Sequence, residues 1–273
     1  MTDVAARVET HEADMWARMV AATGKGEGDP LGARVDRTGR VPLFALTALN
    51  VPLFNRVVSL GVAEPADDAV LDRVLGWFAG HGQSRFWVEV TPVARPSNLR
   101  ELLAARGLVD SGIRQAKTWR RPALVPVDPA IVIEELTIED RDDFAAVNVA
   151  AWEVPPVLTP WFGATVGVDG FRHFGVRDEA GRVISTGSLF VRDGVAWLGY
   201  GATYPEFRGR GYQTALLAHR VSEAARMGCE IAHSETRQDA STPDEPNPSL
   251  HNMLRTGFEI LYDKEIWAPA ARA

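Results

Sequence analysis

The 273-residue sequence predicts an α/β or α+β protein of two domains, because helical and strand patterns alternate along it and one order occurs twice. That order is helix, strand, helix, a glycine-containing turn and a final strand. It ends first at Trp119 and again at Trp267. The local sequence agrees as well, since Leu102–Leu108 aligns with Asn252–Phe258. We interpret this as an internal duplication; the alternative is two generic α/β units that share the order by chance.

A proline-rich segment separates the two copies. Residues 121–129 contain Pro122, Pro126 and Pro129 and show no hydrophobic period, which is typical of a linker. The predicted division is a first domain at 1–121, a linker at 122–129 and a second domain at 130–269.

The first domain contains predicted helices and strands but no phosphate-binding motif. We expect helices at 9–21, 67–79 and 97–106, a Gly-rich connection at 24–28, an apolar segment at 41–62, and strands at 86–90 and up to 121. The chain before the second helix reads Leu-Gly-Val-Ala-Glu-Pro at 60–65, without an Arg-Gly-x-Gly motif. Leu102 stands where the second copy has Asn252. We therefore expect this copy to bind no cofactor.

The second domain begins with a strand and a near capping box, Thr137 to Asp140, that starts a helix. The remaining expected elements are strands at 131–136, 171–178, 182–191, 195–203 and 229–234, and helices ending at 151, 227 and about 256. The segment 152–162 contains three prolines and cannot continue the first helix.

The most informative stretch is 203–217, where a strand end, a glycine-rich turn and a helix start follow directly. Such a turn aims unpaired N–H groups and the positive end of the helix dipole at one point, which favours a pyrophosphate. Arg208 and Arg210 lie inside the turn, and Arg220 adds to the local positive charge. The alternative for Arg220 is that its charge falls near the turn by chance. The alternative for the whole turn is a basic surface turn that caps a helix and binds no anion.

Two motifs make the assignment specific. Pro-x-x-Arg-Gly-x-Gly-x-Gln at 205–213, followed by Ser-x-x-Asn-x-x-x-x-Gly-Phe at 249–258, resembles the GNAT (Gcn5-related N-acetyltransferase) superfamily over residues 131–267. The resemblance implies an α+β fold with two GNAT-like domains, each a mixed, mostly antiparallel sheet with helices on both faces. The first copy would be a degenerate GNAT-like domain.

The resemblance also implies a reaction: an amine of a small molecule or peptide attacks the thioester of an acyl-CoA, with acetyl-CoA as the expected donor. Two alternatives stay open. One is a non-catalytic acyl-CoA-binding module; the other is an acyltransferase acting on a hydroxyl or thiol.

In relatives of this kind, a strand edge and the turn after it hold the cofactor. By resemblance, the backbone of Gly201, Ala202 and Thr203 pairs with the pantetheine arm. The pyrophosphate is then expected to bind the N–H groups of Arg208, Gly209, Arg210, Gly211, Tyr212, Gln213 and Thr214. Ser249 and Asn252 are expected to contact the cofactor from the other side.

The acceptor side is expected near the proline-interrupted segment, which covers the acceptor in relatives. Trp152, Trp161 and Phe162 would line its pocket, together with Glu153 and Tyr200. The alternative is that these aromatic side chains seal the core beneath a loop. The acidic groups of the stretch 237–246 could attract a cationic amine, although a solvated loop without a role is the alternative.

Proton transfer is where this sequence departs from the family. The tyrosine that often serves as general acid would lie four residues before Gly257, where Met253 stands, and the strand 195–203 has no Asp, Glu or His. Glu235 and His233 are the candidate catalytic residues, with Glu153 and Tyr200 as further candidates. The alternative is that each is only a polar group near a strand end.

Composition excludes several other classes. A net charge of −7 argues against a nucleic-acid-binding protein, and no run reaches the roughly 18 apolar residues of a membrane span. The N-terminus lacks an apolar signal core, and Cys229 is the only cysteine, so we expect a cytoplasmic protein with Cys229 as a buried apolar residue. No metal site is predicted, and no pattern indicates an oligomeric state.

Overall fold

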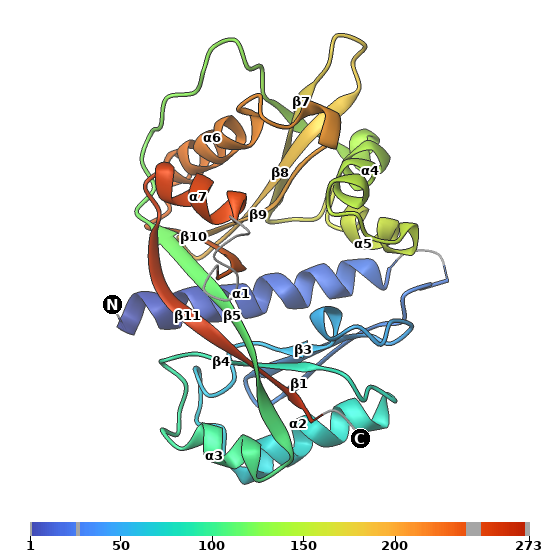
Figure 1. Ribbon diagram of the computed structural model, residues 1–273, viewed down its shortest axis with the longest axis vertical. Coiled ribbons are helices and arrows are strands. Elements are labelled where there is room, and N and C mark those ends of the chain that lie inside the picture. The colour runs from blue at the N-terminus through green and yellow to red at the C-terminus, as the bar shows by residue number, and fades with distance from the viewer. Residues whose placement is uncertain (1, 26–27, 239–246, 271–273) are drawn as a thin grey trace. The chain divides into compact units, whose positions relative to one another are not determined.

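The computed structural model describes residues 2–25, 28–238 and 247–270. The chain divides into two compact units, each considered by itself (Figure 1). Unit 1 comprises Met1–Lys117, Thr236–Pro246 and Ile260–Ala273, and unit 2 comprises Thr118–Glu235 and Asn247–Glu259.

Unit 1 is built on a mixed sheet with the strand order β1-β2-β3-β4-β11-β5. Its elements are α1 (Thr2–Thr23), β1 (Ala33–Thr38), β2 (Val41–Leu46), η1 (Pro52–Phe54), β3 (Arg56–Val57), α2 (Asp68–Gly80), β4 (Trp87–Val90), α3 (Leu99–Ala104), β5 (Leu108–Arg120) and β11 (Glu259–Pro269). β3 and β4 pair in parallel, whereas β1–β2, β2–β3 and β4–β11 are antiparallel. Helix α1 covers one face of this sheet, and α2 and α3 cover the other (Figure 1).

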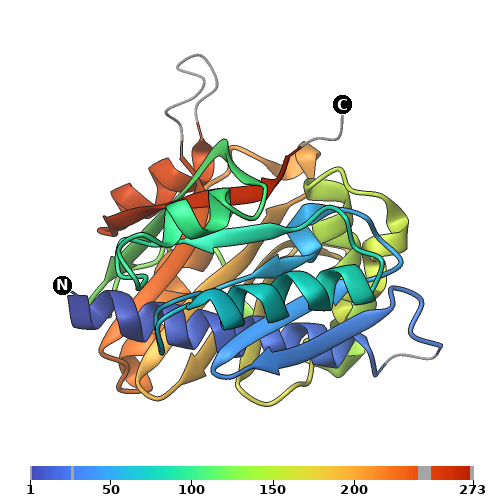
Figure 2. The same ribbon diagram turned by 90° about the horizontal axis from the view of Figure 1, so that it is seen from below.

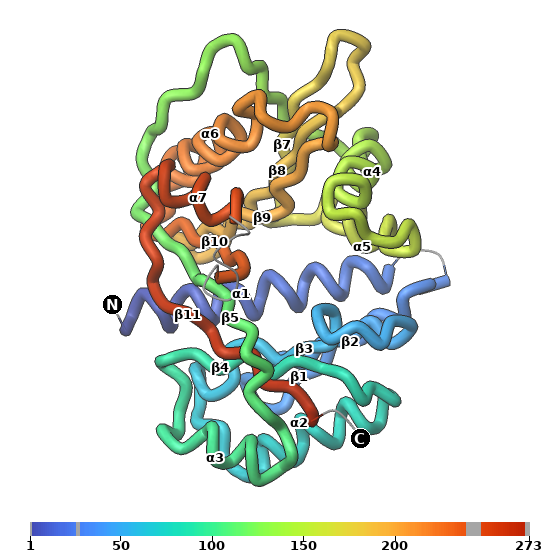
Figure 3. The backbone as a smooth tube through the Cα atoms, in the orientation of Figure 1, coloured from blue at the N-terminus to red at the C-terminus, as the bar shows by residue number. Residues whose placement is uncertain are grey.

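The C-terminal strand β11 belongs to unit 1, whereas the sequence predicts a second domain at 130–269. Ile266 is the register partner of Glu89 on β4, and Trp267 is the partner of Val88. Trp267 is part of the apolar core beneath α2 and α3. Figures 2 and 3 show β11, in red, beside β4. The units therefore do not follow the predicted linear boundaries, because a strand pairs where its apolar side chains are buried and not where chain order would place it.

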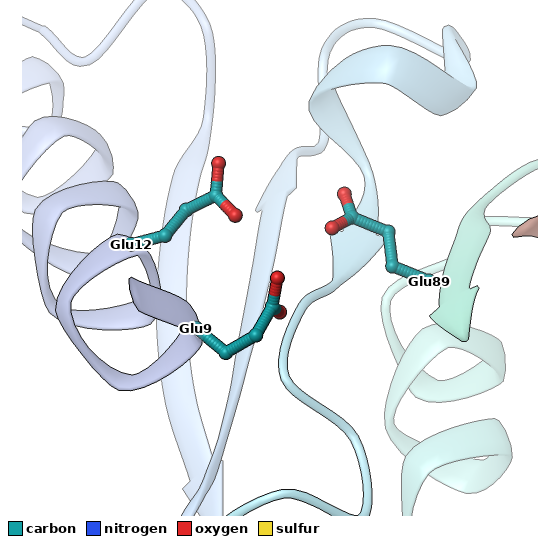
Figure 4. A group of neighbouring side chains, drawn as sticks. All are labelled: Glu9, Glu12 and Glu89. Atoms are coloured by element: carbon teal, nitrogen blue, oxygen red, sulfur yellow. The ribbon is translucent and has the colours of Figure 1, made fainter. Parts of the chain in front are cut away.

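A cluster of buried charges packs α1 against this sheet. The glutamates Glu9 and Glu12 on α1 and Glu89 on β4 are at most 1 % exposed, and their carboxylates point toward one another (Figure 4). The ammonium of Lys264, from β11, contacts all three: its Nζ lies 2.7 Å from Glu89 and 3.3 Å from Glu9, and it also pairs with Glu12.

Two more buried cations complete this cluster. Lys117 Nζ lies 2.6 Å from Glu12, and Arg56 pairs with Glu89. Each of the three carboxylates therefore has a buried cation beside it, as buried charges require. Three neighbouring glutamates could in other surroundings hold a metal ion, but here the Lys264 ammonium occupies the position between them.

In unit 2 the strands follow the order β10-β9-β8-β7-β6. Its elements are β6 (Glu134–Leu136), η2 (Ile138–Asp140), α4 (Arg141–Ala151), η3 (Pro156–Leu158), α5 (Thr159–Gly163), β7 (Phe171–Arg177), β8 (Val183–Arg192), β9 (Val195–Thr203), η4 (Pro205–Phe207), α6 (Tyr212–Arg226), β10 (Ile231–Arg237) and α7 (Pro248–Arg255). Only β9 and β10 pair in parallel among these neighbours. Helices α6 and α7 lie on one face, and α4 and α5 on the other (Figure 1).

One order of elements occurs twice along the chain. From α1 to β5, a helix, three antiparallel strands, a helix, a parallel strand, a helix and a last strand follow one another, and the same order runs from α4 to β11 with the short helix α5 added after α4. This supports the interpretation as a duplication and confirms the predicted α+β class with mixed, mostly antiparallel sheets. Cys229 is buried in the core of unit 2, as predicted, and burial raises the pKa of its thiol.

The predicted linker 122–129 packs along α6 within unit 2. Val125 N–H donates to Ser222 Oγ at 2.9 Å, and Val125 and Ile131 pack against the core of that unit. The apolar residues between the prolines explain why this segment binds the helix.

Candidate functional site

A β-bulge interrupts strand β9. Thr186 and Ser188 of β8 are two residues apart, whereas their partners Ala202 and Gly199 are three apart, so β9 carries one extra residue here. Tyr200, inside the bulge, has a φ of 49°. A bulky side chain rarely adopts this left-handed conformation, and such strain is concentrated at functional sites.

Strands β9 and β10 separate next to the bulge. Their parallel pairing covers Val195 to Trp197 of β9 and ends with the Trp197–His233 pair. Ser234 Oγ still donates to Leu198 O at 2.7 Å. Beyond it, the described residues show no pairing of β9 at 201–203 with β10. This is the position at which the sequence analysis expects the pantetheine arm.

The glycine-rich turn follows this edge directly. Gly209 and Gly211 have φ values of 78° and 80°, which glycine tolerates far better than any other residue. Gly211 is the N-cap of α6, and as a glycine it has no side chain with which to cap the helix start. The N–H groups of the first turn are therefore available for an anion. Arg208 and Arg210 are both exposed here.

The two arginines of the turn are held differently. Arg208 Nη2 donates to Ala151 O, at the end of α4, at 2.7 Å. The Arg210 guanidinium lies 5.1 Å from the centroid of the Phe207 ring. The Arg208 guanidinium is thus held at the end of α4, whereas the Arg210 guanidinium lies beside a ring of the turn itself.

Helix α7 brings Asn252 to the same place. Asn247 caps α7 by accepting from the N–H groups of Ser249 and Leu250, and Pro248 follows it, as predicted. Thr214 Oγ1, in the first turn of α6, lies 3.5 Å from Asn252 Oδ1. The structure thus brings Thr214 and Asn252 together, while Ser249 stays exposed on the first turn of α7.

Gln213 uses its side chain to hold the sheet. Its Nε2 donates to Ala202 O at 2.7 Å and to Ser185 Oγ at 2.9 Å. A Cβ on Gly201 would lie 2.6 Å from Gln213 Oε1, which explains the glycine. The side chain of Gln213 is therefore committed to the end of β9, and only its N–H can serve the predicted pyrophosphate site.

The predicted acceptor residues form an aromatic cluster. The ring centroids of Trp152 and Phe162 lie 5.4 Å apart, and that of Tyr200 lies 5.5 Å from Phe162 and 6.1 Å from Trp152. Trp152 is 45 % exposed, whereas Trp161, Phe162 and Tyr200 are at most 6 % exposed. For the buried rings this geometry favours the alternative of aromatics that seal the core. Trp152 and Glu153 remain accessible.

The candidate proton-transfer groups differ in burial. His233 is fully buried, and Glu235, two residues further along β10, is half-buried. Burial raises the pKa of Tyr200 well above its ordinary value, so this phenol stays protonated. Met253 packs in the core with its Sδ 3.2 Å from Thr118 Oγ1, and a thioether cannot donate a proton. The acidic groups of the stretch 237–246 lie outside the described residues.

The corresponding helix start in unit 1 is closed by its own chain. Asp67 caps α2, and its carboxylate accepts from Val70 N–H at 2.8 Å. In the loop before it, Gly61 O accepts from Arg95 N–H, and a Cβ on Gly61 would lie 2.4 Å from Arg95 O. An acidic cap occupies the place that an anion would need. This contrast with Gly211 supports the prediction that the first copy binds no cofactor.

Comparison with known proteins identifies the family. A family model described as the acetyltransferase (GNAT) family matches residues 134–253. An acetyltransferase of Pectobacterium atrosepticum is 30 % identical over 112 residues, which cover 38 % of this chain and 77 % of that relative. The chain belongs to the acetyltransferase (GNAT) family. It is therefore a GNAT-type acyltransferase, an enzyme that transfers an acyl group from an acyl-CoA.

Solved GNAT structures cover nearly the whole chain. A GCN5-related N-acetyltransferase from Kribbella flavida has a TM-score of 0.62 at 16 % identity and covers 95 % of this chain and 96 % of its own. A tandem GNAT protein from the clavulanic acid biosynthesis pathway has a TM-score of 0.61 at 16 % identity, with 97 % and 96 % covered. These likenesses concern the fold. Among the described helices of this GNAT protein, none is long and apolar enough to cross a membrane.

Sequence reasoning missed two parts of this site. The bulge in β9 is invisible in the alternation of apolar residues, although Gly199 and Gly201 on either side of Tyr200 are a signal for it. Arg220 was read as part of the positive charge for the cofactor. Its side chain is instead 3 % exposed, beneath the sheet, because it bonds strand carbonyls there.

Proposed function

We propose that unit 2 transfers an acetyl group from acetyl-CoA to an amine of a small molecule or peptide. One observation carries this proposal: the free edge of β9 leads without interruption into an uncapped glycine turn at Gly211. An extended polar arm that ends in a pyrophosphate fits such a track, since the arm adds as a strand and the phosphates meet the helix N-terminus. Acetyl-CoA is that kind of ligand.

The cofactor contacts follow from this track. Gly201, Ala202 and Thr203 would pair with the pantetheine arm, and the N–H groups from 208 to 214 would bind the pyrophosphate. Asn252, beside Thr214, would contact the cofactor from α7. The thioester would then lie where β9 and β10 part, close to Glu235 and to the exposed ring of Trp152.

The reaction at this place is a direct displacement. The neutral amine nitrogen attacks the thioester carbonyl carbon, the new C–N bond forms, and the C–S bond breaks to release the CoA thiolate. The amine gives up one proton to become neutral and a second after attack, and the thiolate takes up one to form CoA. Glu235 is the proposed acceptor of the amine's proton, directly or through water. A thiolate leaves without help, so Met253 is compatible with turnover.

An acceptor screen tests this function. Release of free CoA from acetyl-CoA is measured with the full chain and a panel of small amines and N-terminal peptides. We expect release that depends on the acceptor. Binding of CoA without such release from any amine, alcohol or thiol would indicate the non-catalytic module instead. CoA release with hydroxyl or thiol acceptors alone would indicate an O- or S-acyltransferase.

Charge in the turn gives a separate prediction. Changing Arg208 and Arg210 together to Ala should weaken CoA binding at least tenfold while pantetheine binding changes little, because charge-assisted bonds to phosphate contribute about 1.5–3 kcal/mol each. Calorimetry with both ligands measures this. The control is Arg226→Ala, which removes an exposed cation at the far end of the same helix. Equal losses for CoA and pantetheine would assign these arginines to folding, for example through the bond from Arg208 to Ala151 O.

A further inference from the structure

A buried guanidinium lies beneath the bulge of β9. Arg220 projects from the middle of α6 and is 3 % exposed. Its Nη1 donates to Gly199 O at 2.8 Å, on the bulge, and to Ser188 O at 3.0 Å, on the neighbouring strand β8. Its Nε donates to Leu216 O at 3.0 Å, which fixes the side chain along its own helix. The guanidinium thus bridges the two strands where their register shifts.

The sheet leaves room for this side chain at two glycines. A Cβ on Gly187, which lies in β8 opposite the bulge, would be 2.6 Å from Arg220 Cζ. A Cβ on Gly201 would be 4.0 Å from Arg220 Nη2. Any larger residue at 187 would push the guanidinium away from the bulge.

The charge of Arg220 has no carboxylate to offset it among the described residues, and burial lowers the pKa of the guanidinium to about 9. Burial of a charge without an ion pair is costly, and a Leu or Met in this place would pack at no such cost. Neither Leu nor Met could donate to the carbonyls of Ser188 and Gly199, the pair that flanks the bulge. The second bulge carbonyl, Tyr200 O, accepts instead from Thr186 Oγ1 at 3.4 Å.

We propose that Arg220 is a positioning residue that fixes the bulge of β9, and with it the place of the acyl-CoA thioester. This rests on the proposed function. Helix α6 carries the glycine turn at its start and Arg220 two turns further on. One rigid helix therefore sets the spacing between the two ends of the cofactor site, the pyrophosphate turn and the point where β9 leaves β10.

The test compares two ligands on the full chain. Acetyl-CoA needs both ends of the site, whereas adenosine 3′-phosphate 5′-diphosphate has the phosphates of CoA but no pantetheine arm. Arg220→Met should weaken acetyl-CoA about tenfold to hundredfold and leave the nucleotide within about twofold, as expected for lost bonds from a charged donor. Arg220→Lys keeps a cation but not the planar guanidinium, so its affinity for acetyl-CoA should lie between those of the wild type and Arg220→Met.

The matched control is Val221→Ala, which removes fully buried apolar volume from the same helix without touching the bulge. It should lower stability and keep the ratio of the two affinities. If Arg220→Met does not fold, Gly187→Ala replaces it as the test, because the added Cβ displaces the guanidinium and should change the ratio of the two affinities in the same direction. An unchanged ratio in the folded Arg220 or Gly187 variants, or an equal change in Val221→Ala, would overturn the proposal. Wild-type protein that binds neither ligand would instead refute the proposed function.

Discussion

Replacing Lys264 by methionine is expected to lower the free energy of unfolding of unit 1 by about 3–5 kcal/mol, because it removes the cation that contacts all three buried carboxylates. Lys264 is fully buried, so water cannot solvate the charge that remains. Methionine keeps the length and apolar stem of the lysine. Urea unfolding followed by tryptophan fluorescence measures the loss, since Trp267 belongs to the core of this unit.

A neighbouring ion pair on the same strand is the control. Arg100 pairs with Glu265 of β11 at 2.8 Å, but its side chain is 45 % exposed. Arg100→Met should cost at most about 1 kcal/mol, since exposed pairs contribute little. Equally small losses for Lys264→Met and Arg100→Met would mean that the buried cluster does not stabilise unit 1.

Restoring the charge balance should restore stability in part. Glu12 lies beside both Lys264 and Lys117. In the double variant Lys264→Met with Glu12→Gln, two charges of opposite sign are absent, and the loss should be smaller than the sum of the two single losses. A double-mutant cycle measures this coupling directly. Simple additivity would mean that these two side chains do not act as one network.

The sequence predicted what depends on neighbouring residues. Gly209 and Gly211 adopt positive φ because the turn between η4 and α6 requires it, and a few adjacent residues determine this turn. The caps of α7 and of the helix after Thr137 are local for the same reason. The family motifs lie in these local segments, which is why both the fold class and the cofactor turn could be predicted.

What the sequence did not predict depends on distant pairing. Lys264 stands between Asp263 and Glu265 and reads as part of a solvated strand, yet it is buried because β11 lies beside β4. Arg220 likewise reads as a surface cation of a helix. Its burial follows from an extra residue in β9, which no helical period can reveal. Such positions are decided by register between segments far apart in the chain.

The role of Glu235 makes the strongest catalytic prediction. Glu235→Gln should lower acceptor-dependent turnover about 10²–10⁴-fold and leave CoA affinity unchanged, because it removes a proton acceptor and keeps the side chain's size. Initial rates of CoA release measure turnover, and calorimetry measures CoA affinity, so the two effects are separated. Glu179→Gln is the control: it removes an exposed carboxylate in the turn between β7 and β8, and we expect turnover to stay near that of the wild type.

The pH dependence distinguishes a base from a structural carboxylate. A base must be deprotonated to act, so turnover should fall at low pH, and Glu235→Gln should abolish that acidic limb. A purely structural role would lower turnover equally at all pH values. If the variant keeps near-normal turnover and follows the acceptor's own pKa, the amine arrives already neutral. Catalysis would then depend on positioning of the two substrates alone. The strand 195–203, which has no carboxylate, and the buried thioether of Met253 agree with this outcome. Positioning can by itself lower the activation barrier by several kcal/mol.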